Sequence, residues 1–188
     1  MSGRVVPGMP ARARRAATES RRDRDWLLWL ARFRFVTAAD LAARFGVSEQ
    51  QARARVRRLQ AAGLLGCTRA HVGQPFAIYM TPHGAAVLGL PGRFRVPRAG
   101  VQRKHELAIV RFVAALERRA PGLAVLTERE CRRREAETSE RFSVDVLGPG
   151  RRARRWPDAV VQLPRRRAAV EFEFTTKSKE RLRQIVGA

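Results

Sequence analysis

The chain has 188 residues, with 39 Lys or Arg against 17 Asp or Glu, and its formal net charge is +22 at pH 7. Its two cysteines, Cys67 and Cys131, are far apart, which argues against a disulfide framework and a zinc site. No stretch approaches the roughly twenty apolar residues of a membrane span, and the N-terminus lacks the apolar core of a secretory signal. We expect a cytoplasmic protein without a membrane partner, whose field attracts nucleic acid or an acidic protein.

The first part of the chain is polar and basic. Residues 1–21 contain Gly, Pro, Ala and Arg without an apolar period, which predicts a disordered arm able to contact phosphate backbones or to act as a plain flexible terminus. Apolar residues then recur at helical spacing from Trp26 to Phe33, with arginines between them. This spacing predicts a helix that closes the core of a domain over residues 22–90.

Two further helices are expected between Val36 and Leu65. Thr37 can cap the first of them, and Gly46 ends it. Ser48 and Gln51 have the spacing of a capping box, so a second helix begins at Glu49. At about 100° per residue, this second helix has one packing side, formed by Ala52, Val56 and Leu59.

The other side of the second helix carries amide and guanidinium groups. Such groups pair bidentately with adenine and guanine edges in the major groove of DNA. The alternative is an ordinary solvated face on an arginine-rich helix. The candidate DNA-binding residues are Gln50, Gln51, Arg53, Arg57 and Arg58, together with Arg69 and His71 of the segment that follows.

A hairpin is predicted after the second helix. Its strands run from Leu64 to Cys67 and from Phe76 to Met80, and its tip runs from His71 to Pro75. Thr81 can then cap a short helix that runs through Leu88. A hairpin directly after two such helices is typical of a winged helix-turn-helix domain, here residues 22–90, and residues 91–100 read as a linker.

The remaining residues, 101–188, predict a small α/β domain. A helix is expected over Val101–Arg119, and a last one from Thr176 or Lys177 to Val186. A charged insert, Glu128–Arg141, separates the first two expected strands. The expected strands are Leu123–Leu126, Phe142–Leu147, Asp158–Leu163 and Ala168–Thr175.

Alternation in the last of these strands places Val170, Phe172 and Phe174 on one face, so Glu171 and Glu173 share the other. Adjacent carboxylates repel unless a cation lies close to them, and Asp158 of the neighbouring strand can add a third oxygen ligand. Three carboxylates suit a Mg²⁺ ion that activates water for phosphodiester hydrolysis. The alternative is that both glutamates pair with arginines on a solvated sheet face.

The stretch from Trp156-Pro157-Asp158 to Glu171-Phe172-Glu173 resembles the core of the PD-(D/E)XK nucleases. The resemblance implies catalytic roles for Asp158, Glu171 and Glu173, and a metal site of Asp158, Glu171 and the helix acid Glu106. The position of the family's lysine holds Glu173, so Lys177 would supply the catalytic amine, with Lys179 as an alternative that holds the phosphate or the attacking water. We expect His105 to be a packing residue rather than a base.

Three motifs together resemble the replication-relaxation family of bacterial plasmids and mobile elements: Tyr79-Met80-Thr81-Pro82-x-Gly84, Lys104-His105-Glu106-Leu107, and Pro157-Asp158 with Glu171-Phe172-Glu173 and Lys177-Ser178. The resemblance implies a double-stranded DNA-binding protein of replication, relaxation or mobilisation. Because that core would normally continue with another strand after the last helix, we expect the second domain to be incomplete.

The overall expectation is an α+β chain: a winged helix-turn-helix followed by a small α/β domain similar to a PD-(D/E)XK core. Its function is DNA binding without a cofactor, and a homodimer or replication and mobilisation proteins are further partners. The alternatives are a Mg²⁺-dependent endonuclease or nickase, a winged-helix transcription regulator, and a protein that binds RNA or an acidic protein through the same basic surface.

Overall fold

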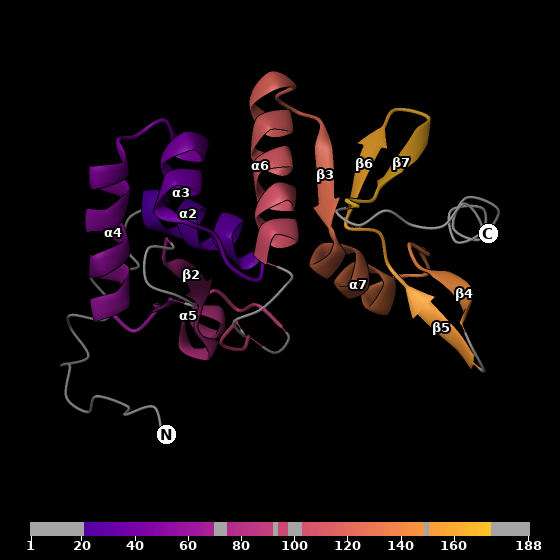
Figure 1. Cartoon of the computed structure of the whole chain (residues 1–188), viewed down its shortest axis with the longest axis horizontal. Helices are drawn as coiled ribbons and strands as arrows, with labels where there is room; N and C mark the ends of the chain where they lie inside the picture. Colours follow the sequence, from indigo (N-terminus) through magenta and orange to yellow (C-terminus); the bar gives the residue numbers. More distant parts are fainter. Residues whose placement is uncertain (1–20, 70–74, 92–93, 98–102, 149–150, 174–188) are drawn as a thin grey trace. The chain divides into compact units, whose positions relative to one another are not determined.

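A computed structural model describes residues 21–69, 75–91, 94–97, 103–148 and 151–173 (Figure 1). The predicted basic arm, His71, Lys177, Lys179 and the predicted last helix lie outside the described residues, apart from residue 21 of the arm. The chain divides into two compact units, Met1–Gly100 and Val101–Ala188, and each is considered by itself. Helices alternate with small antiparallel sheets in the described ranges, so the prediction of a mixed α and β chain is confirmed.

In the described part of the first unit, three helices precede a hairpin and one follows it (Figure 1). The helices are α2 (Arg21–Ala31), α3 (Ala38–Phe45), α4 (Glu49–Ala61) and α5 (Pro82–Val87), and the strands are β1 (Leu65–Thr68) and β2 (Ala77–Met80). The predicted caps are confirmed: Thr37, Ser48 and Thr81 cap α3, α4 and α5. Gly46 ends α3 in the left-handed conformation, at a φ of 64° that glycine adopts without steric cost.

The hairpin is tied to the start of α3. Strands β1 and β2 pair in antiparallel fashion from Leu65 opposite Met80 to Thr68 opposite Ala77. Val36 adds one bridge to β2, because its N–H donates to the Ile78 carbonyl at 2.9 Å and its carbonyl accepts from the Ile78 N–H at 2.8 Å. Buried side chains of α2 and α4, including Leu27, Leu30 and Leu59, lie in the core of this unit.

Thr81 and Gly84 explain the predicted Thr-Pro-x-Gly motif as a packing device. The Thr81 hydroxyl donates to the Gly63 carbonyl at 2.7 Å and accepts from the Gly84 N–H at 2.9 Å. A Cβ atom on Gly84 would lie 2.2 Å from the Leu64 carbonyl oxygen, closer than a van der Waals contact permits. The motif therefore lets α5 approach the segment between α4 and β1.

The second unit contains a long helix, a three-stranded sheet and a separate two-stranded ribbon. Its elements are α6 (Arg103–Arg119), β3 (Ala124–Thr127), α7 (Glu128–Glu137), β4 (Val144–Gly148), β5 (Arg151–Arg155), β6 (Ala159–Leu163) and β7 (Arg166–Val170). The sheet has the order β3-β6-β7, and β4 pairs only with β5 among the described strands. Figure 1 shows the β4–β5 ribbon beyond the end of α7, apart from that sheet.

The second unit contains two elements that the sequence analysis did not predict and one that it misplaced. The charged insert contains helix α7, and the arginine run Arg151–Arg155 is a strand. The last predicted strand, Ala168–Thr175, is displaced, because Leu163 pairs with Arg166 across a tight turn and Ala159 pairs with Val170. Strand β6 begins at Ala159, just after Pro157, and Ala159 is the partner of Val170. Strand β7 therefore ends at Val170, and Glu171 and Glu173 follow the strand instead of sharing one of its faces.

A small apolar cluster joins α7 to the strands. Cys131, Phe142 and Val160 are buried in it, and Leu126 and Trp156 pack against them. The buried face of α6 is formed by Leu107, Ile109, Val110, Val113 and Ala114. No helix in the described ranges is long and apolar enough to cross a membrane.

Candidate functional site

The exposed face of α4 lies opposite its packing side. At about 100° per residue, Gln50, Ala54 and Arg57 lie on the side of the helix away from Ala52 and Val56. The first three are exposed, and the last two are buried. Within the described parts of the chain, neither the Gln50 nor the Arg57 side chain makes a hydrogen bond or an ion pair. Their polar groups are therefore available to a ligand.

Two other predicted DNA-binding residues on α4 are engaged along their own helix. The Gln51 side-chain oxygen accepts from the Ser48 N–H at 3.0 Å, which completes the capping box. Arg53 forms an ion pair with Glu49 one turn earlier, and both side chains stay largely solvated. Gln51 therefore helps to begin the helix, and Arg53 retains guanidinium N–H groups for phosphate.

Arg58 points to a different partner. Its Nη2 lies 2.6 Å from both carboxylate oxygens of Asp23 on α2, and Asp23 is fully buried. Arg55 Nη1 is 3.6 Å from the same carboxylate, and its guanidinium lies 5.0 Å from the Trp26 ring centroid. These contacts hold α4 against α2. Asp23 was missed by the sequence analysis, since nothing in its local pattern indicates a partner 35 residues away.

The hairpin presents one arginine on an aromatic ring. The Arg69 guanidinium lies 4.2 Å from the Phe76 ring centroid, and Phe76 is 49% exposed. The two residues follow the Thr68–Ala77 pair at the outer end of the described hairpin. Stacking orients a guanidinium while its N–H groups remain available. Phe76 is a functional candidate that the sequence analysis did not name.

In the second unit, residues of two of the sequence motifs meet at one oxygen atom. His105 Nε2 donates to Asp158 Oδ2 at 3.0 Å, and the Phe172 N–H donates to the same oxygen at 2.7 Å. The Phe172 ring lies edge-on to the rings of His105 and Phe112. Asp158 thus links α6, the start of β6 and the segment after β7. His105 is a packing and hydrogen-bonding residue in this arrangement.

The predicted metal ligands do not gather into a site. Glu106 is partly buried on α6, and Glu171 and Glu173 are exposed beyond β7. Among the residues that the structure describes, no three His, Cys, Asp or Glu side chains form a group that could hold a metal ion. The described part of the chain therefore shows no assembled metal site at Asp158, Glu171 and Glu106.

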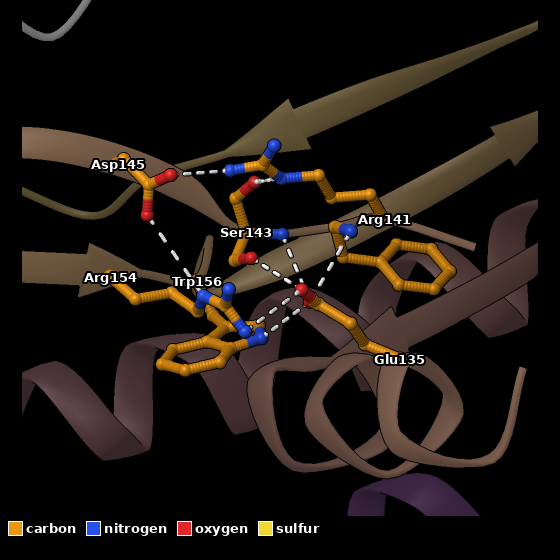
Figure 2. Close-up of polar contacts among 7 residues, drawn as sticks. Glu135, Arg141, Ser143, Asp145, Arg154 and Trp156 are labelled. Atoms are coloured by element: carbon orange, nitrogen blue, oxygen red, sulfur yellow. Dashed lines mark hydrogen bonds and ion pairs between the residues drawn. The ribbon is translucent and has the colours of Figure 1, made fainter. Parts of the chain in front are cut away.

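A further polar cluster surrounds Glu135 of α7 (Figure 2). Its carboxylate accepts from the Ser143 hydroxyl and N–H, and from the Trp156 indole N–H at 2.8 Å. The hydrogen bond from Ser143 is the largest influence that lowers the pKa of Glu135, which keeps the carboxylate ionised. Glu135 was missed because α7 was read as an insert. The Thr127-x-x-Glu130 capping box was the signal that could have located this helix.

Comparison with protein families gives one match that covers most of the chain. The family model described as replication-relaxation matches residues 27–187. No curated protein and no solved structure matches the chain.

Proposed function

The chain belongs to the replication-relaxation family, and from this premise we propose that it binds double-stranded DNA in the replication of a plasmid or mobile element. In this proposal α2, α3, α4 and the β1–β2 hairpin form a winged helix-turn-helix domain. Helix α4 is its recognition helix, and the hairpin is its wing.

The observation that carries the proposal is that some polar side chains of α4 hold the helix on the core while others are exposed. Arg58 is used to fix the helix on α2, whereas Gln50 and Arg57 are exposed and make no polar contact in the described parts of the chain. A helix of this kind fits the major groove, where Gln pairs with adenine and Arg with guanine. Ala54 lies on the same face and is too small to hold the helix away from base edges.

Phosphate contacts supplement the base contacts. Arg53 at the edge of the α4 face and Arg69 stacked on Phe76 supply cations on both elements of the proposed domain. The net charge of +22 attracts any duplex through counterion release, without regard to sequence. His71 belongs to the same proposed wing and lies outside the described residues. A transcription regulator would use the same surfaces, and a second copy or replication proteins remain predicted partners.

A Mg²⁺-dependent nuclease is the second candidate. This candidate is supported by the two hydrogen bonds that Asp158 accepts, from His105 and from the Phe172 N–H. Glu106 is next to His105 in the sequence, and Glu171 and Glu173 flank Phe172. The resemblance to PD-(D/E)XK nucleases would add Lys177 as the catalytic amine. The proposed DNA-binding function does not depend on these roles.

One experiment tests both candidates. The purified chain is incubated with labelled random duplex and with single-stranded DNA across a salt series, with and without Mg²⁺, and strand integrity is followed in the same samples. A duplex preference with a steep salt dependence and intact strands is expected. Equal or stronger binding to single strands would overturn the proposed duplex function. Cleavage that requires Mg²⁺ and disappears in Glu171→Ala would establish the nuclease instead.

A further inference from the structure

We propose that the β4–β5 ribbon is a second DNA-binding element, which contacts the phosphate backbone through arginines of the ribbon and of its base on α7. This inference rests on the proposed DNA-binding function and assigns a role to the second unit. The arginine ribbon is defined here as β4 and β5 with the side chains of Arg132, Arg141, Arg154 and Arg155.

The arginine ribbon is anchored at its base by Glu135. A two-stranded ribbon alone is marginally stable in water. Here the Glu135 carboxylate receives the N–H and hydroxyl of Ser143 just before β4 and the indole N–H of Trp156 just after β5 (Figure 2). One side chain of α7 thereby holds the ribbon at its base, where β4 begins and β5 ends. The ribbon is therefore positioned before any ligand arrives, which lowers the entropy lost on binding.

The cations of the arginine ribbon are oriented and still solvated. Arg141 donates to Asp145 at 2.7 Å, and Arg154 lies 3.9 Å from both Asp145 and Glu135 (Figure 2). The Arg132 guanidinium lies 4.1 Å from the Trp156 ring centroid. Each of these three arginine side chains is more than half exposed. Each guanidinium carries five N–H donors, so donors remain for phosphate oxygens.

Arg155 is the clearest contact residue. It stands opposite Val144 in the ribbon and is exposed, and its side chain makes no hydrogen bond or ion pair within the described ranges. The four arginines of the ribbon outnumber the three carboxylates that contact them in the described part of the chain, Asp145, Glu135 and Glu128, so the net charge of the ribbon is positive. A two-stranded ribbon is also narrow enough to follow the major groove of duplex DNA.

The test measures how the DNA-binding constant depends on salt concentration, because the slope of this dependence reports the number of phosphate contacts. For the full chain, the logarithm of the binding constant for random duplex is plotted against the logarithm of salt concentration, and each lost contact reduces the slope by about 0.9. Arg155→Ala should reduce the slope by about 0.9, and Arg154→Ala/Arg155→Ala by about 1.8. The matched control, Arg118→Ala/Arg119→Ala, removes two charges from the end of α6 and should leave the slope unchanged.

The outcomes separate this inference from the proposed function. If the wild-type chain binds duplex and Arg155→Ala keeps the wild-type slope, the arginine ribbon has no DNA contact. If the wild-type chain shows no duplex binding, the proposed function itself fails. Poly-glutamate serves as the acidic-protein probe: a ribbon variant that loses poly-glutamate binding but keeps its duplex slope would overturn the assignment to DNA. Because Arg155→Ala breaks no described ion pair, a change in its slope reports a lost DNA contact rather than misfolding.

Discussion

Asp23 and Arg58 join α2 to α4 through a carboxylate that is fully buried and a guanidinium that is half exposed. A buried charge is costly unless it is paired, so this contact fixes how α4 lies on the core. Arg57, the preceding residue, is exposed and makes no such contact with α2. Of these two adjacent arginines, Arg58 stabilises the packing of α4 on α2, whereas Arg57 stays on the surface.

The Asp23–Arg58 pair predicts that Arg58→Ala and Asp23→Ala lower the stability of the first unit by different amounts. Arg58→Ala leaves a buried carboxylate whose remaining cation among the described residues is Arg55, at 3.6 Å, whereas Asp23→Ala leaves Arg58 free to turn to solvent. We expect Arg58→Ala to lower the free energy of unfolding of the first unit by about 2 kcal/mol, below the 3–5 typical of a wholly buried pair. Asp23→Ala should cost less. Urea unfolding measures both, and Arg57→Ala is the control that should stay near wild type.

Gln50 and Arg57 are expected to carry discrimination between DNA sequences. Gln50→Ala/Arg57→Ala should weaken binding to a selected preferred duplex far more than to random duplex, because a bidentate base contact contributes about 1–3 kcal/mol of discrimination. Competition binding against both duplexes gives the ratio. Arg53→Ala is the matched control and should weaken both duplexes alike. An equal loss on both duplexes in the double variant would remove α4 as a base reader.

His105 and Asp158 should be energetically coupled. Asp158→Ala also removes the acceptor of the Phe172 N–H, so it should destabilise the second unit more than His105→Ala does. In a double-mutant cycle we expect a coupling energy of about 0.5–1.5 kcal/mol, the net value of one hydrogen bond. The measurement is the free energy of unfolding of the two single variants and the double variant. Additive losses would show that the contact contributes nothing.

Glu135 predicts that the base of the ribbon loosens in acid. Its pKa in the folded chain is below the ordinary 4.5, chiefly through the Ser143 hydrogen bond. A lowered folded pKa adds stability that is fully present above the unfolded pKa and lost as the pH falls through the folded pKa. Hydrogen exchange of the Ser143 amide should therefore accelerate below about pH 4.5 beyond the intrinsic rate. Glu135→Gln keeps a hydrogen-bond acceptor but has no charge to titrate, so the acceleration of Ser143 amide exchange in acid should disappear.

Both cysteines should react slowly with alkylating reagents in the folded chain. Burial raises the pKa of the Cys67 thiol to about 11 and that of Cys131 to about 12, so little thiolate forms near neutral pH. Cys131 is also wholly inaccessible. In Cys67→Ser, iodoacetamide labelling followed by mass spectrometry should require unfolding of the second unit. Rapid labelling of native Cys131 would contradict the described packing.

Local signals in the sequence determined much of the first unit. Thr37, Ser48 and Thr81 satisfy the first amides of their helices with side chains at most three residues away, so capping can be recognised without knowledge of the fold. The packing side of α4 follows from helical period alone. For the same reason α7 was recognisable in principle, because Thr127 and Glu130 form the same kind of box.

Only the tertiary structure decided which polar groups are engaged and which remain available. Helical spacing placed Arg57 and Arg58 alike on the outer part of α4, but Asp23 lies 35 residues earlier in the chain and selects Arg58. The end of β7 at Val170 is set by pairing with β6, which removed the expected pair of glutamates on one strand face. Partners in space depend on the packing of elements distant in sequence, and no local period or cap encodes that choice.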